Sequence, residues 1–129
     1  MNTRIQYLYR DADNYKVHNE CVVEGEFDRA QIQEMLACCD CGEYFIPRQV
    51  GLPEKQFENF DPAVDHCWFE LAADGFEATP FPATVALTAQ QLVKNFKSCQ
   101  DHWNASAPNL NEITAASPNE LKTQMDGMT

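Results

Sequence analysis

Apolar and polar residues alternate along the first part of the chain. Ile5, Tyr7 and Tyr9 recur at every second position, the period that places one face of a strand in a core. A cluster of turn-forming residues follows at 11–14, and the alternation resumes over 15–23. This pattern predicts a β-hairpin.

Two later segments have the periodicity of helices. Asp28 and Gln31 have the three-residue spacing of a capping box, which predicts a helix that begins after Asp28. Thr88 and Gln91 repeat that spacing and predict a second helix. Apolar residues follow each cap at helical intervals: Ile32, Met35, Leu36 and Cys39 in the first helix, and Leu92, Phe96, Cys99 and Trp103 in the second. Gly42 is the expected stop after the first helix.

The middle of the chain predicts two more strands and a long connection. Residues 43–46 read as a third strand closed by Pro47, and residues 66–71 as a central strand. The turn-rich stretch 50–62 between them predicts a long loop, and long loops in small domains are often functional. Residues 79–82 contain two prolines and predict a sheet edge or a connection.

These elements predict an α+β fold in the order ββαββα. We expect a two-layer sandwich, with a mainly antiparallel sheet and about two helices on one face. A length of 129 residues and 44% hydrophobic residues fit one domain, predicted over 1–104. Residues 105–129 have no aromatic side chain, which predicts a flexible polar tail or one short docking helix.

Two features of the sequence favour a cytoplasmic protein. No apolar run is long enough to cross a bilayer, and the first residues lack the apolar stretch of a signal peptide. In that reducing compartment the six cysteines are expected to be thiols or metal ligands.

The negative charge is concentrated in the middle of the chain. Between Glu20 and Glu77 fourteen acids meet three bases, whereas acids and bases are equal in number elsewhere, so this window carries the whole net charge of −11. Such a domain repels nucleic acid and anionic membranes and is attracted to basic protein surfaces. The alternative is an acidic surface that serves only solubility.

The cysteines suggest a zinc site as an alternative. Cys38 and Cys41 have the two-residue gap with which two sulfurs reach one zinc ion, and Cys99 and His102 repeat it. A four-ligand site would stabilise a small protein-interaction module. Against zinc, Cys39 and Cys99 fall on apolar helix faces, where cysteine usually acts as a small hydrophobe.

Catalysis has little support in the sequence. Cys38 and Cys41 lie at a predicted helix C-terminus, where the helix dipole disfavours a reactive thiolate. His66 and Cys67 are strand neighbours, so their side chains point to opposite faces and form no dyad. We therefore expect a protein that is not an enzyme, with no catalytic residue and no cofactor apart from the zinc alternative.

Three strings of the sequence resemble those of a known class of proteins. Residues 43–47, 50–53 and 65–70 are similar to segments of small acidic proteins encoded on conjugative and phage-derived elements of gut bacteria. The resemblance covers about residues 3–103 and implies an accessory protein of a mobile element. Such elements carry inhibitors of host defence, including anti-CRISPR and anti-restriction proteins, several of which present an acidic face to a nucleic-acid-binding site. It identifies no functional residue.

Charge and resemblance together lead to one hypothesis. We expect an acidic binding protein that inhibits or modulates a basic, nucleic-acid-handling partner, and that binds neither nucleic acid nor membrane itself. The predicted contact surface combines acids around the first helix with acids of the long loop. These acids are Glu24, Glu26, Asp28, Glu34, Glu54, Glu58, Asp61 and Asp65.

Overall fold

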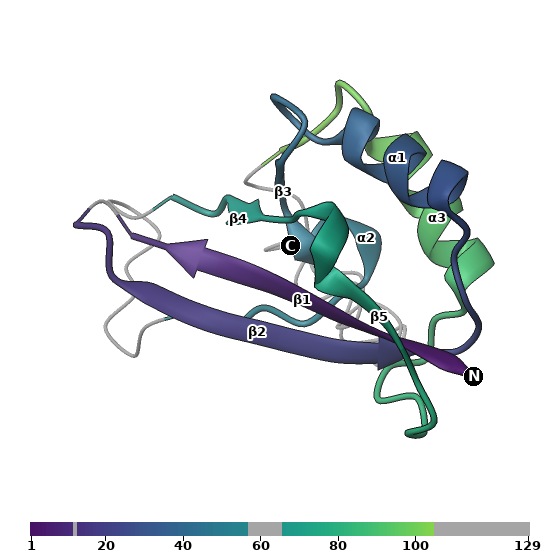
Figure 1. The fold of residues 1–129 in the computed structure, drawn as a ribbon. Coiled ribbons are helices and arrows are strands. Elements are labelled where there is room, and N and C mark those ends of the chain that lie inside the picture. The colour runs from purple at the N-terminus through teal and green to yellow at the C-terminus, as the bar shows by residue number, and fades with distance from the viewer. Residues whose placement is uncertain (12, 57–65, 105–129) are drawn as a thin grey trace, which may run out of the picture.

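A five-stranded antiparallel sheet and three helices form the α+β fold that the sequence predicts (Figure 1). The computed structural model describes residues 1–11, 13–56 and 66–104. In chain order the elements are β1 (Asn2–Arg10), β2 (Lys16–Val23), α1 (Arg29–Cys38), β3 (Tyr44–Phe45), α2 (Pro47–Val50), β4 (Phe69–Glu70), the short 3₁₀ helix η1 (Ala73–Gly75), β5 (Phe76–Thr79) and α3 (Ala89–Cys99).

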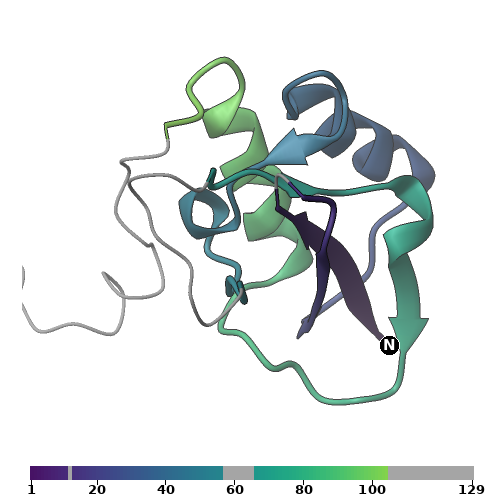
Figure 2. The ribbon, with the colours of Figure 1, turned by 90° about the vertical axis from the view of Figure 1, so that its left-hand side faces the viewer.

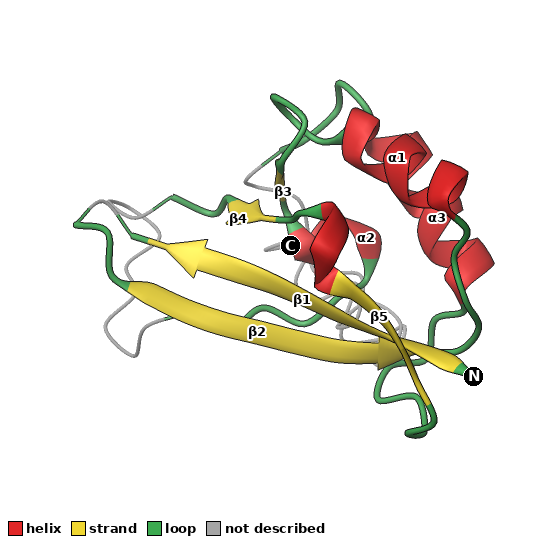
Figure 3. Ribbon diagram, viewed as in Figure 1, coloured by secondary structure: helices red, strands yellow, loops and turns green. Residues whose placement is uncertain are grey.

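The helices and the sheet make two layers. Helices α1 and α3 lie side by side over one face of the sheet, and α2 packs against α3 (Figures 1 and 2). Phe45 of β3 stacks on Phe96 of α3 with ring centroids 5.5 Å apart, which joins the two layers in the core. The other face of the sheet carries no described helix (Figure 3).

The predicted hairpin is confirmed. β2 pairs with β1 along all of its length, from Val23 opposite Thr3 to Lys16 opposite Arg10. The Asp11 carboxylate accepts hydrogen bonds from the backbone N–H of Asp13 and Tyr15, each at 2.9 Å, as expected of a turn-forming side chain.

Strand β1 is paired along both edges. One edge meets β2, and the other meets β4 at Leu8 and Tyr9 and β5 at residues 2–5. Strands β4 and β5 therefore behave as one strand interrupted around Gly75. A Cβ atom on Gly75 would lie 2.5 Å from the carbonyl oxygen of Gln6, so only glycine fits against the backbone of β1 at this point.

Alternation along β1 separates the core from a polar face. Ile5, Tyr7 and Tyr9 are buried beneath the helices. The residues that alternate with them, Arg4, Gln6, Leu8 and Arg10, face the other way, and the two arginines make ion pairs across the sheet. In these pairs Arg4 lies 2.5 Å from Glu77, and Arg10 lies 2.8 Å from Glu70.

Both predicted capping boxes are present. The Asp28 carboxylate accepts from the Gln31 N–H at 2.7 Å, and the Gln31 amide oxygen accepts from the Asp28 N–H at 2.9 Å. Thr88 and Gln91 make the same reciprocal pair at the start of α3. The two helices thus begin where local side-chain chemistry predicts.

The structure differs from the sequence prediction in two elements. Pro47 does not merely close β3 but occupies the first turn of α2, where its missing N–H costs no hydrogen bond. Residues 76–79 form β5 on β1, a strand that the sequence did not predict, and the edge or connection expected at 79–82 begins at its last residue. The predicted strand at 66–71 shortens to β4, which lies between β1 and β3 and is central as expected.

Three predictions concern residues that the structure does not describe. The tail at 105–129 and residues 57–62 of the loop predicted at 50–62 lie outside the described residues, so the division at residue 104 stays a prediction. Within the described part of the chain, no helix is long and apolar enough to cross a membrane.

Candidate functional site

Three of the predicted partner-binding acids precede α1, and a fourth lies within that helix. Glu24, Glu26 and Asp28 are exposed along the segment that leads from β2 into α1, and Glu34 is exposed on α1. The Glu34 carboxylate lies 3.2 Å from the Lys97 ammonium of α3, a surface ion pair that offsets its charge.

Glu54 corrects the prediction of an acidic loop surface. Only 10% of its side chain is exposed, and its carboxylate accepts hydrogen bonds from the backbone N–H of Arg48 at 2.8 Å and from the Arg48 side chain at 3.2 Å. Glu54 therefore braces α2 and is not an exposed contact residue, because the chain after Gly51 turns back along that helix. Glu58, Asp61 and Asp65 lie outside the described residues.

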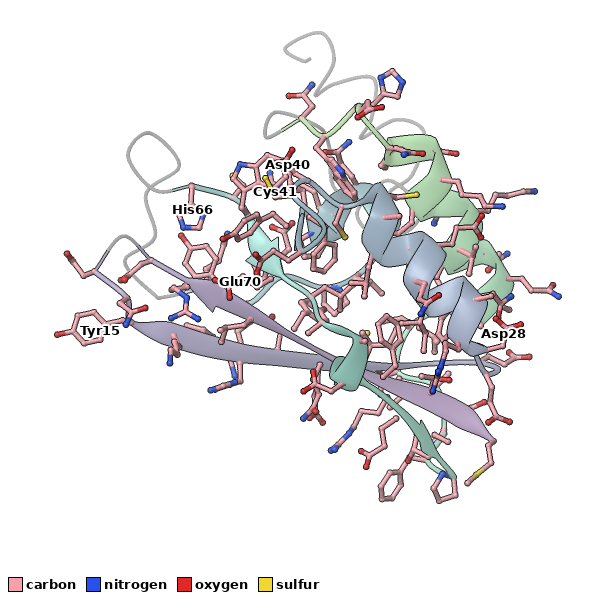
Figure 4. The ribbon with its side chains drawn as sticks, turned by 45° about the horizontal axis from the view of Figure 1, so that its top comes forward. Tyr15, Asp28, Asp40, Cys41, His66 and Glu70 are labelled. Carbon is pink, nitrogen blue, oxygen red and sulfur yellow. The ribbon has the colours of Figure 1, made fainter. Side chains whose placement is uncertain are left out.

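A second group of acids lies at the other end of α1. Figure 4 shows Asp40, Cys41, His66 and Glu70 at the end of the molecule away from Asp28. Cys41 and Gly42 have φ values of 54° and 76°, and the Glu43 N–H donates to the Asp40 carbonyl at 3.2 Å. These are the features of a type I′ turn, which exposes Asp40, Cys41 and Glu43.

Strand pairing aligns the side chains that surround this turn. Asp40 is opposite Tyr44, Tyr44 is opposite Glu70, and Glu70 is opposite Leu8. Residues directly opposite in an antiparallel sheet share a face, so this row lies on the face away from the helices. There a hollow of about 240 Å³ is lined by Asp40, Tyr44, His66 and Trp68.

His66 is held in one orientation at the hollow. Its Nδ1 accepts from the Trp68 N–H at 3.1 Å, which leaves Nε2 to carry the proton that it donates to the Arg10 carbonyl at 2.6 Å. The ring also lies against Tyr9, with centroids 5.1 Å apart, and the Tyr9 hydroxyl donates to the His66 carbonyl. With both nitrogens engaged, His66 serves as a fixed wall and not as a base or a ligand.

The electrostatic environment of the hollow is negative. The Glu43 carboxylate, partial desolvation and the Glu70 carboxylate raise the pKa of the Tyr44 hydroxyl, and Arg10 acts in the opposite direction. Arg10 is itself held by Glu70, and this hydrogen bond raises the pKa of its guanidinium. Asp40 and Glu43 have no basic side chain within 4.0 Å among the described residues. The charges around the hollow therefore favour the binding of a cation there.

The predicted zinc ligands are not brought together. Cys38 and Cys99 are buried, whereas Cys41 and His102 are exposed. Helix α1 ends at Cys38 and the next residue is extended, which carries Cys41 out onto the exposed turn. Among the described residues, no group of three or more His, Cys, Asp or Glu side chains is placed to hold a metal.

The residues of the hollow were not predicted as a site. Tyr44 and Trp68 read as strand residues and Asp40 as part of a cysteine motif. The available signal was the alternation of His66, Trp68 and Glu70, which places polar and aromatic side chains on one face of a strand. The partner strand and its register are set by tertiary pairing and are not visible in that pattern.

Comparisons of the chain with known protein families, curated proteins and solved structures found no match.

Proposed function

We propose that the chain is a non-enzymatic binding protein that inhibits or modulates a basic, nucleic-acid-handling partner. One observation carries the proposal: many exposed carboxylates meet no basic side chain within 4.0 Å in the part of the chain that the structure describes. They are Asp13, Glu24, Glu26, Asp28, Asp40, Glu43, Asp74 and Asp101.

The distribution of bases strengthens the argument. Arg4, Arg10, Arg48 and Lys97 each lie in an ion pair with a carboxylate of the same chain. These four charges are therefore largely compensated within the fold. The other described bases, Lys16, Arg29, Lys55 and Lys94, are exposed but fewer than the uncompensated acids, so the surplus charge of the described surface is negative. A surface of this kind raises the association rate with a positively charged protein and repels nucleic acid.

The resemblance of three segments to accessory proteins of mobile elements supports a particular class of partner. Such a partner belongs to host defence and binds nucleic acid through a basic groove, as CRISPR and restriction proteins do. An acidic protein seated on that groove competes with the nucleic acid for the same positive charges. The proposal includes a cytoplasmic location, where such a partner acts.

The test is capture of a partner from host lysate, followed by charge reversal. We expect the combined variant Glu24→Lys, Glu26→Lys and Glu43→Lys to bind the captured partner at least about tenfold more weakly at low salt, about 1.4 kcal/mol. The three side chains are exposed, so the fold should survive their replacement. The loss should shrink at high salt, because salt screens exposed charges over about 8–10 Å.

A matched control changes the surface without changing its charge. The combined variant Gln33→Ala, Gln90→Ala and Ser98→Ala replaces exposed neutral side chains and should bind as the wild type does. If the charge-reversed and wild-type proteins bind the captured partner with equal affinity, the acids serve only solubility and the proposal is wrong. A captured partner without a nucleic-acid-binding surface would also contradict the proposal.

A further inference from the structure

We propose that the hollow lined by Asp40, Tyr44, His66 and Trp68 accepts an arginine side chain of the partner. The inference rests on the proposed function and names the group that this end of the molecule recognises. Four observations support it: aromatic walls, an uncompensated carboxylate, fixed geometry, and a volume of about 240 Å³ on an open sheet face.

Aromatic rings supply the walls. Tyr44 and Trp68 are half-buried, so each ring is held by the sheet on one side and meets solvent on the other. A guanidinium is planar and weakly hydrated, and it stacks on such rings through cation–π attraction, most strongly on tryptophan. An ammonium gains less from a flat wall because it is compact and strongly hydrated.

Asp40 supplies the charge. Its exposed side chain lies on the rim without a described basic partner, and Glu43 adds a second carboxylate on the same turn. The guanidinium of Arg10, which acts electrostatically on Tyr44, is held by Glu70 and by the Asn14 side chain. A carboxylate and a guanidinium pair through two parallel hydrogen bonds, which gives arginine a geometric advantage over lysine.

The same features exclude other occupants. An anion or a nucleic-acid phosphate is repelled by Asp40 and Glu43. A metal ion lacks ligands, because both His66 nitrogens are already hydrogen-bonded and one carboxylate cannot hold it. A purely apolar ligand would bury the Asp40 carboxylate without a partner, at a large cost in desolvation.

The site is also preorganised. Strand pairing with β4 fixes Tyr44, three contacts fix His66, and the type I′ turn fixes Asp40. A rigid site loses little entropy when it binds, which suits it to receive one anchoring side chain.

The direct test uses two blocked peptides of equal charge, acetyl-Gly-Arg-Gly-amide and acetyl-Gly-Lys-Gly-amide. We expect the arginine peptide to bind at least about threefold more tightly in an NMR titration, with the Trp68 indole N–H among the shifted signals. Trp103 provides an internal control, because its indole N–H donates to the Cys38 carbonyl at 2.9 Å away from the hollow. Its signal should stay in place.

Variants separate the hollow from general acidity. Asp40→Asn should weaken binding of the arginine peptide about fivefold, whereas Glu26→Gln removes the same charge at the other end of α1 and should change it little. Trp68→Leu should abolish the preference for arginine over lysine. If Trp68→Leu fails to fold, the comparison of Asp40→Asn with Glu26→Gln tests the proposal. Asp40→Asn should fold, because the side chain that it alters is exposed.

The outcomes distinguish this inference from the proposed function. Equal binding of the two peptides, an unmoved Trp68 indole signal, or equal losses for Asp40→Asn and Glu26→Gln would overturn the arginine site. A captured basic partner that binds Asp40→Asn as tightly as wild type would also overturn it and leave the proposed function intact. Selective arginine binding without any basic partner in the lysate would support the site and overturn the function.

Discussion

At the scale of single residues, buried thiols are the main ionisable groups inside the core. Cys21 and Cys39 are 3% and 6% exposed. Burial raises the pKa of each thiol to about 12, because a thiolate loses its hydration there. The core therefore depends on both groups staying protonated.

We expect the free energy of unfolding to fall as the pH rises from about 9 to about 12. In that window each thiol is deprotonated in the unfolded chain and protonated in the folded one. Below about pH 9 both states hold the proton, so the full contribution is present. Each thiol should lower the free energy of unfolding by about 1.4 kcal/mol for each pH unit in this window. Denaturant unfolding at several pH values measures the slope.

A variant identifies the source of this slope. Cys39→Ala should reduce the slope by about 1.4 kcal/mol per pH unit, whatever its effect on stability at neutral pH. A slope identical to that of the wild type would show that Cys39 does not titrate across this range.

From the sequence alone, the contacts of a residue could be predicted where its partner lies nearby in the chain. Asp28 with Gln31 was recognisable because both members of the capping box lie within one helical turn. Glu54 was misjudged because its burial depends on Arg48 and the path of α2, which charge counting does not reveal. Tyr44 and Trp68 were overlooked for a similar reason: they meet only after distant strands pair.

At the scale of elements, the interrupted strand formed by β4, η1 and β5 is the feature most dependent on one residue. Gly75 does not have a positive φ, so its need for glycine comes from the close approach to Gln6 and not from backbone conformation. The 3₁₀ helix η1 absorbs the extra residues between the two pairing segments.

We expect Gly75→Ala to destabilise the protein by about 1–3 kcal/mol, the range for overpacking, because the backbone of β1 must move to admit the methyl group. Thermal and denaturant unfolding measure the loss, and hydrogen exchange should show lower protection in β1. At Gly42 a Cβ would meet nothing within 4 Å, so Gly42→Ala should cost only the strain of the left-handed backbone conformation, about 1–2 kcal/mol, without that change in exchange. Unchanged stability of Gly75→Ala would contradict the close approach.

A helix or strand could be predicted where its sequence pattern lies within the element itself. Two helices and the hairpin follow from caps and alternation. Helix α2 was missed because four residues are too few to show a helical period, and a proline reads equally as a stop or a start. Strand β5 was missed because it is stabilised by pairing with a strand about 70 residues earlier in the sequence.

At the scale of the whole molecule, the residues described before the tail form a continuous core among themselves. Its buried apolar residues run from Ile5 to Cys99, and half-buried Trp103 packs against them. Among the described residues, α3 is the last helix of the layer that covers the sheet.

We expect a chain that ends at Asn104 to fold, with a loss of less than about 1–2 kcal/mol in the free energy of unfolding, because residues 1–104 already bury a continuous core. Thermal unfolding of the shortened and full chains gives the comparison. A chain that ends at Thr88 lacks Leu92 and Phe96 and should not fold, which serves as the control. An unfolded 1–104 chain would show that apolar residues of the tail belong to the core.

The position of β1 has a consequence for the order in which the fold can be completed. β1 is synthesised before the other described strands, yet its partners along one edge, among the described residues, are 69–70 and 76–79. At about 5–20 residues per second, several seconds of translation separate the end of β1 from the start of β4. Throughout that interval the native partners of this edge do not exist, so the first strand made is among the last to be fully paired.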